Sequence, residues 1–173
     1  FIFRIYGGGS FTNVAEPMGA NAGVNYSSLA WGDYDTDGDL DLAVSGTPDG
    51  GASDRLIIYR NNGGGSFTNA AEPLGASAGV NVSSLAWGDY DNDGDLDLAV
   101  SGHDLTNPRL IIYRNNGGGS FTNVAEPMGA NAGVQNSSLA WGDYDNDGDL
   151  DLAVSGHDNG TNKRLIIYRN NGG

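Results

Sequence analysis

The chain has 173 residues, of which 29 are glycine and none is cysteine, and its formal net charge is −14. Its length suits about one ordinary domain, and the absence of cysteine excludes a disulfide framework, a thiol nucleophile and a cysteine-based metal site. The negative charge repels nucleic-acid phosphates and anionic lipids, and no apolar run approaches the roughly eighteen residues of a membrane span, so we expect neither nucleic-acid binding nor membrane insertion.

The first six residues, "FIFRIY", predict a short extended strand. They are too few for a signal peptide and lack its flanking pattern. Phe3 and Arg4 match Tyr59 and Arg60 in the later stretch "LIIYRNN", so the segment resembles a third repeat strand without its own repeat. We therefore interpret residues 1–6 as a stray N-terminal strand.

The rest of the chain repeats itself three times. Trp31, Trp87 and Trp141 are spaced by 56 and 54 residues, and the phenylalanines that open "FTN" follow the same spacing. We read residues 1–173 as one repeat array. Its repeats span 11–61, 66–116 and 120–171.

Each repeat predicts four short strands, in the order "SSLAWGD", "LDLAVSG", "RLIIYRN" and "SFTNVAE" or a close variant. Strands of this length, separated by Gly, Asn and Asp, predict an all-β fold, and no segment has a sustained helical period. The run "LIIY" is apolar at successive positions, which is typical of a strand covered on both faces. Four-stranded antiparallel sheets packed in a row, as in β-propeller blades, provide that cover. An open stack of blades would satisfy the same pattern.

Five aspartates stand at alternate positions between the first two strands of every repeat. In the first copy, Asp33 to Asp41 read D-x-D-x-D-G-x-L-D. Carboxylates at positions 1, 3 and 5 can converge when the chain curls, glycine at position 6 permits the turn, and a backbone carbonyl at position 7 adds an oxygen. Several hard anionic oxygens suit Ca²⁺, and Asp41 at position 9 must close the site because Val44 stands where an EF-hand has glutamate.

The aspartate loop has three alternatives to a calcium site. A solubilising acidic turn is a poor use of five carboxylates beside a glycine at the right offset. A catalytic metal would need an open coordination position and a nearby base, and no histidine lies in the loop. Magnesium prefers fewer carboxylates and more water.

"AWGDYDNDGDLDLAVSG", followed by "RLIIYRNNGGGSFTN", resembles the VCBS/FG-GAP repeat across essentially the whole chain. The resemblance implies integrin-alpha-type β-propeller blades with about one Ca²⁺ per repeat, three per chain. It also implies side-chain ligands at positions 1, 3, 5 and 9 and a backbone ligand at position 7. The implied ligands are Asp33, Asp35, Asp37, Asp39, Asp41, Asp89, Asp91, Asp93, Asp95, Asp97, Asp143, Asp145, Asp147, Asp149 and Asp151. Such propellers usually have about seven blades, whereas this chain has three repeats.

Strand order predicts that the aspartate loop and "NGGGS" share one edge of each sheet, and that the sequence variation gathers at the opposite edge. Four N-x-[ST] triplets lie at that variable edge and are candidate glycan acceptors. They begin at Asn25, Asn81, Asn136 and Asn159.

These features favour a non-catalytic, calcium-stabilised extracellular or cell-surface module that builds an adhesive or structural assembly. Three blades are too few to close a ring, so we expect the ring or a fibre to be completed by other copies, with the strand at Phe11 finishing a neighbour's last blade. A lectin that binds glycans at the variable edge is an alternative. A designed symmetric propeller without a biological function is another. No constellation of residues predicts an enzyme.

Overall fold

The computed structural model describes residues 2–6, 10–19, 23–50, 53–73, 75, 79–129, 133–160 and 162–172. These residues form strands, turns and connecting segments, and none of them is helical, which confirms the all-β prediction. No helix capable of spanning a membrane is found within the described ranges. The strands are β1 (Ile2–Tyr6), β2 (Ser10–Ala15), β3 (Val24–Gly32), β4 (Asp41–Pro48), β5 (Arg55–Asn61), β6 (Phe67–Ala71), β7 (Asn81–Gly88), β8 (Asp97–His103), β9 (Pro108–Asn115), β10 (Phe121–Ala125), β11 (Gln135–Gly142), β12 (Asp151–His157) and β13 (Lys163–Tyr168).

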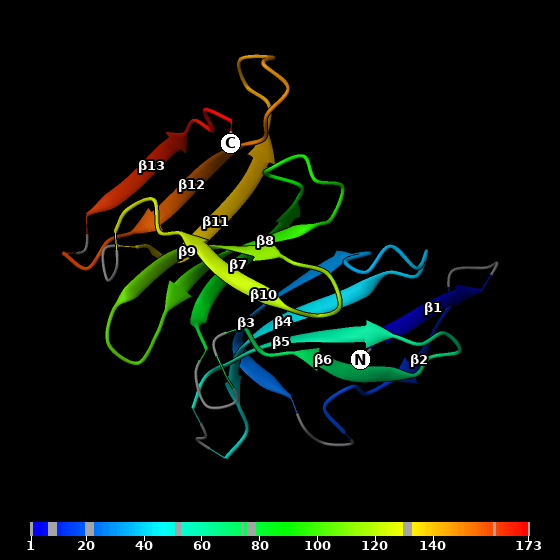
Figure 1. Ribbon diagram of the computed structural model, residues 1–173. Coiled ribbons are helices and arrows are strands. Elements are labelled where there is room, and N and C mark those ends of the chain that lie inside the picture. Colours follow the sequence, from blue (N-terminus) through cyan, green and yellow to red (C-terminus); the bar gives the residue numbers. More distant parts are fainter. Residues whose placement is uncertain are drawn as a thin grey trace.

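Strands β3 to β13 form three consecutive antiparallel sheets, which we call blades (Figure 1). Blade 1 has the order β3-β4-β5-β6, blade 2 repeats it as β7-β8-β9-β10, and blade 3 contains β11-β12-β13. Neighbouring strands follow one another in sequence, since short loops join antiparallel strands directly. The arrangement confirms the prediction of propeller-type blades.

The first two strands form a separate two-stranded sheet, the N-terminal hairpin. Phe3 pairs with Asn13 and Arg4 pairs with Thr12. Tyr59 and Arg60 of β5 use the same register with Asn69 and Thr68 of β6. The hairpin is therefore equivalent to the third and fourth strands of a blade.

The blades begin and end at different strands from the predicted repeats. Blades 1, 2 and 3 span residues 24–71, 81–125 and 135–168, whereas the repeats at 11–61, 66–116 and 120–171 each begin with an outer strand. The repeat boundaries thus remain a sequence prediction, and the blade is the unit that hydrogen bonds hold together.

Two buried hydrophobic clusters lie between the blades, and a third lies on the face of blade 1 that is turned away from blade 2. Leu56 and Ile58 of blade 1 belong to one buried cluster with Leu98, Val100 and Ile111 of blade 2. The other face of blade 2 packs against blade 3 through an equivalent cluster: Leu110, Ile112, Leu152 and Val154. Burying side chains of this kind stabilises a fold by about 1.5–3 kcal/mol each. The expectation that "LIIY" is covered on both faces is confirmed in β5 and β9, where all four residues are buried.

Candidate metal centre

Each aspartate loop curls because its first carboxylate is bound by backbone amides ahead of it. We name the loops by residue range: loop 1 is 33–41, loop 2 is 89–97 and loop 3 is 143–151. In loop 1, Asp37 N–H donates to Asp33 Oδ1 at 3.1 Å and Gly38 N–H donates to Asp33 Oδ2 at 3.0 Å. Gly38 has φ +93°, a conformation in which only glycine is unstrained, so the turn requires it.

Loops 2 and 3 reproduce these bonds. Asp93 and Gly94 donate to Asp89 at 3.0 Å each, and the two amides in loop 3 donate to Asp143 at 3.1 Å. Three copies thus hold the same curl by means of the backbone, which confirms the turn predicted from glycine at position 6.

The third position of every loop has a carboxylate oxygen without a hydrogen-bond partner among the described residues. Asp35 Oδ1, Asp91 Oδ1 and Asp145 Oδ1 are each buried without a hydrogen bond. A buried carboxylate oxygen is costly unless a donor or a cation compensates it. The same orphaned atom in three loops fits a bound cation, and its ligand chemistry suits Ca²⁺.

The structure brings three carboxylates together in each loop, with a difference between copies. Positions 1, 3 and 5 cluster in loop 1, whereas positions 1, 3 and 9 cluster in loops 2 and 3. The ligand atoms within each cluster lie within 4.8 Å of one another, and the clusters are Asp33–Asp35–Asp37, Asp89–Asp91–Asp97 and Asp143–Asp145–Asp151. The remaining implied ligands at positions 5 and 9 lie in the same loops but outside these clusters; they are Asp93, Asp147 and Asp41.

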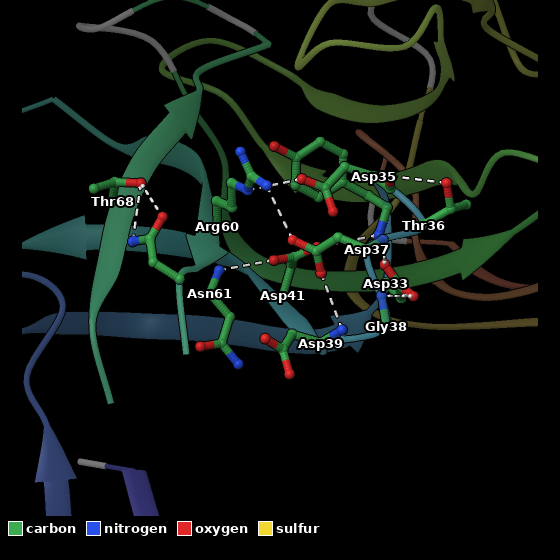
Figure 2. Close-up of polar contacts among 12 residues, drawn as sticks. Asp33, Asp35, Thr36, Asp37, Gly38, Asp39, Asp41, Arg60, Asn61 and Thr68 are labelled. Atoms are coloured by element: carbon green, nitrogen blue, oxygen red, sulfur yellow. Dashed lines mark hydrogen bonds and ion pairs between the residues drawn. The ribbon is translucent and has the colours of Figure 1, made fainter. Parts of the chain in front are cut away.

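The seventh position stands outside all three clusters. Asp39, Asp95 and Asp149 instead donate their backbone N–H groups to the carboxylate at position 5, at 3.0 Å in every loop. Figure 2 shows this bond between Asp39 and Asp37. The contribution implied for these residues is a backbone carbonyl, which does not require their carboxylates to join the cluster.

The ninth position ties the loop to two strands. Asp41 is fully buried, and its two carboxylate oxygens accept bonds from Tyr34 N–H at 3.2 Å and Asn61 N–H at 2.8 Å. Asp97 accepts equivalent bonds from Tyr90 and Asn115, as does Asp151 from Tyr144 and Asn170.

Burial without a cation disfavours the charged form of this aspartate. It raises the pKa of Asp41, and it raises the pKa of Asp97 to about 6, even though backbone N–H groups bind both carboxylates. A nearby divalent cation would restore the ionised form, so the buried carboxylate and the cation stabilise each other.

An arginine at the end of the third strand flanks loops 1 and 3. Arg60 Nε lies 2.8 Å from Asp35 Oδ2, and its Nη2 lies 3.0 Å from Asp37 Oδ2 (Figure 2). Arg169 makes the same two contacts in loop 3 at 2.9 and 3.0 Å. A bond from Asp39 N–H and then the contact with Arg60 lower the pKa of Asp37. Arg60 and Asp35 meet through Oδ2, so the orphaned Oδ1 remains available to a cation.

Loop 2 differs in this contact. Arg114 Nη1 lies 3.9 Å from Asp91 Oδ2, and its Nη2 donates to Asn116 at 3.4 Å. Burial, followed by repulsion from Asp93, raises the pKa of Asp91. Loop 2 therefore has the least compensated carboxylates among the three.

Sequence reasoning missed the asparagine that follows each arginine. The Asn61 backbone N–H binds Asp41, and its side-chain Nδ2 donates to Leu40 O at 3.1 Å. Asn115 and Asn170 bind their own loops in the same way through the backbone. The repeated "RNN" was the available signal, and it confirms that the third-strand end and the aspartate loop share an edge.

The candidate glycan acceptors lie at the opposite edge. Asn25, Asn136 and Asn159 are exposed, whereas Asn81 Nδ2 donates to Asp54 at 3.0 Å. Thr161 of the Asn159 triplet lies outside the described residues. Glycosylation at these asparagines stays a prediction.

A family model described as FG-GAP-like repeat matches the chain three times in succession. The matched residues are 1–44, 46–100 and 102–154, which together include all of loops 1, 2 and 3. No curated protein sequence matches the chain significantly.

Proposed function

Because the chain belongs to the FG-GAP-like repeat family, we propose that it is a non-catalytic, calcium-stabilised module that acts outside the cell and self-assembles. The single observation that carries the calcium assignment is the buried, unpartnered oxygen at position 3 of every loop: Asp35, Asp91 and Asp145. Ca²⁺ takes six to eight oxygen ligands and tolerates irregular geometry, whereas Mg²⁺ keeps more of its water. When bound, the ion would supply charge compensation to the clustered carboxylates.

A structural role follows from what the loop connects. Asp41 opens β4 and accepts N–H bonds from Tyr34 in the loop and from Asn61 at the end of β5. The loop therefore joins consecutive strands of the same blade, and compensating its charge stabilises the sheet. No histidine occurs in the loops to act as a general base beside the ion.

The calcium assignment supports the proposed extracellular location, because modules that act outside cells typically bind Ca²⁺ with dissociation constants of about 10⁻⁴–10⁻³ M. FG-GAP-like repeats are also typical of extracellular proteins. Self-assembly through blade or strand sharing is supported by large apolar side chains exposed at blade 3, including Leu165 and Ile167. Contiguous exposed apolar surface of this kind marks interaction sites. We propose that the assembly has a structural or adhesive purpose.

Thermal unfolding with excess chelator, Ca²⁺ or Mg²⁺ tests the calcium-stabilised module. A ligand that binds only the native state raises the melting temperature by mass action. We expect chelator to lower the melting temperature, and Ca²⁺ to restore it better than Mg²⁺. Equal melting curves in chelator and Ca²⁺ would contradict the proposal.

A further inference from the structure

The two blade interfaces inside the chain use one repeated set of contacts. Trp87 Nε1–H of blade 2 donates to Ala30 O of blade 1 at 3.2 Å, and Trp141 repeats this bond to Ala86 O at 3.1 Å. The Trp87 ring also stacks on Tyr34, with 6.3 Å between ring centroids and 13° between ring planes.

Three further polar contacts recur at both interfaces. The amide of the leucine two residues before the tryptophan donates to a serine hydroxyl of the preceding blade, and two serine hydroxyls from facing strands bond to each other. A third-strand asparagine donates to the loop carbonyl of the preceding blade. The recurring pairs are Leu85–Ser28 and Leu139–Ser84, Ser45–Ser83 and Ser101–Ser137, and Asn115–Tyr34 and Asn170–Tyr90.

On blade 3, the residues equivalent to one side of this interface are exposed. Tyr144, Leu165 and Ile167 are 57%, 81% and 58% exposed. Their equivalents on blade 1, namely Tyr34, Leu56 and Ile58, are at most 3% exposed because blade 2 covers them.

The complementary face of blade 1 is exposed along its first strand, whereas Leu42, Val44, Ile57 and Tyr59 in its other strands are buried, with Met18 packed against them. Leu29 is 60% and Trp31 is 46% exposed, whereas the equivalent Leu85 of blade 2 is 7% exposed. Trp31 contacts Phe67 of its own blade, with 6.3 Å between ring centroids. Figure 1 shows that blade 3 and blade 1 lie on opposite sides of blade 2. The exposed face of blade 3 and the exposed first strand of blade 1 therefore do not meet within one chain.

The glycine at the end of the first strand of a blade leaves room for the tryptophan of the next blade. A Cβ on Gly32 would lie 2.7 Å from the Trp87 ring, and a Cβ on Gly88 would lie 2.7 Å from the Trp141 ring. A Cβ on the equivalent Gly142 would meet nothing within 4 Å. The space beside Gly142 on blade 3 is therefore open to a tryptophan ring, as the spaces beside Gly32 and Gly88 would be without Trp87 and Trp141.

We propose that the space beside Gly142 is filled by Trp31 of a second copy of the chain, and that two copies join head to tail, with blade 3 of each copy packed against the exposed first strand of blade 1 in the other. This inference rests on the proposed self-assembly and adds the residues that make the contact. The described blades of two copies number six, within the range of about four to eight that closed propellers have. The pairing is continuous with the two internal interfaces, because the second copy would repeat their contacts at Ser27, Ser138 and Ser155.

The N-terminal hairpin must change its pairing in this arrangement. β2 is equivalent to a fourth strand, and among the described strands β13 pairs only with β12. β13 of the second copy therefore replaces β1 as the partner of β2, and blade 3 gains the fourth strand that blades 1 and 2 already have.

Sedimentation of the calcium-loaded full chain at micromolar concentration, with three variants, tests the pairing. We expect the mass of two chains for the parent. Trp31→Ala and Gly142→Leu should each weaken association at least roughly 30-fold, because central tryptophan anchors dominate interfaces. Leu105→Ser is the control, since Leu105 is 72% exposed in the β8–β9 loop of blade 2, a blade that already has a neighbour on each face, and its variant should keep the parent's mass.

Mixing the two disrupted variants separates head-to-tail pairing from a contact between like faces. A pair made of one Trp31→Ala chain and one Gly142→Leu chain retains one intact interface, so we expect the two-chain mass to return in part. Failure of the mixture to associate would overturn the head-to-tail assignment.

The outcomes also separate this inference from the proposed function. A monomeric parent that still loses stability in chelator overturns the pairing and leaves the calcium-stabilised module intact. Association that survives both substitutions overturns these contacts and leaves self-assembly intact. A calcium-independent melting curve contradicts the proposed function itself.

Discussion

The indole Nε1–H of Trp87 donates to the carbonyl of Ala30 at 3.2 Å, across the boundary between blades 2 and 1. The same ring lies over Gly32, where a Cβ would be 2.7 Å from two ring atoms. Trp87 and its counterpart Trp141, which precede loops 2 and 3, therefore join neighbouring blades.

Gly32→Ala should lower the free energy of unfolding by about 1–3 kcal/mol, because the added methyl group overpacks the Trp87 seat. Denaturant unfolding in saturating Ca²⁺ measures the change. Gly23→Ala is the matched control, since a Cβ there meets nothing within 4 Å. Equal loss of stability in the two variants would show that backbone freedom, and not contact with Trp87, explains the effect.

Thr36→Asn should stabilise loop 1 by about 1 kcal/mol. Thr36 has φ +58° in the left-handed region, where a β-branched residue is strained and asparagine is better tolerated. Asn92 and Asn146 occupy the equivalent positions with φ +58° and +61°. The reciprocal variant Asn146→Thr should lose a similar amount, measured by thermal unfolding with and without Ca²⁺. A gain in both variants would contradict the strain argument.

Asp91→Ala should remove Ca²⁺ from loop 2 first, because Asp91 supplies the orphaned Oδ1 of that loop. Calorimetric titration should show about one ion fewer per chain than the parent. Asp95→Ala is the matched control: Asp95 is two residues beyond position 5 and lies outside the carboxylate cluster. Loss of the same ion in the control would mean that the total loop charge, and not the cluster, binds Ca²⁺.

The strands and the loop curl were predictable because their signals are local. Gly38 requires a positive φ, and the run in β5 is apolar at successive positions, so both features can be read from a few adjacent residues. The candidate ion ligands could be assigned to one loop in each repeat for the same reason.

The grouping of carboxylates was harder to predict, because it depends on residues distant in sequence. Asp41 is bound by Asn61, which lies 20 residues further along the chain, and Arg60, from the end of β5, contacts both Asp35 and Asp37. The exposure of Leu165 was equally difficult to predict, because β13 has the same "LIIY" run as β5 but, among the described strands, has neither a fourth strand beside it nor a further blade over its outer face. Local sequence sets the strand, whereas the neighbouring blade decides its burial.

The calcium-free protein should lose stability as pH rises from about 4 to about 6. Burial raises the pKa of Asp97 to about 6 from an ordinary value of 3.8, so the folded state holds a proton that the unfolded state has released. Stability falls with rising pH wherever the folded state binds more protons. Thermal unfolding in metal-free buffer should therefore give a higher melting temperature at the lower pH.

Asp97→Asn should flatten this pH dependence, because the amide does not titrate. Saturating Ca²⁺ should also flatten it in the parent, since the cation favours the ionised carboxylate in the folded state. Asp95→Asn should leave the slope of the parent unchanged. A slope that persists in Asp97→Asn would assign the proton to another group.

The number of Ca²⁺ ions bound per chain tests the central claim most directly. Equilibrium dialysis of the metal-free protein against Ca²⁺ at neutral pH, with Mg²⁺ as competitor, gives this number. The three carboxylate clusters, each beside its orphaned buried oxygen, predict three ions per chain that Mg²⁺ displaces poorly. No saturable binding at millimolar Ca²⁺, or equal displacement by Mg²⁺, would contradict the account.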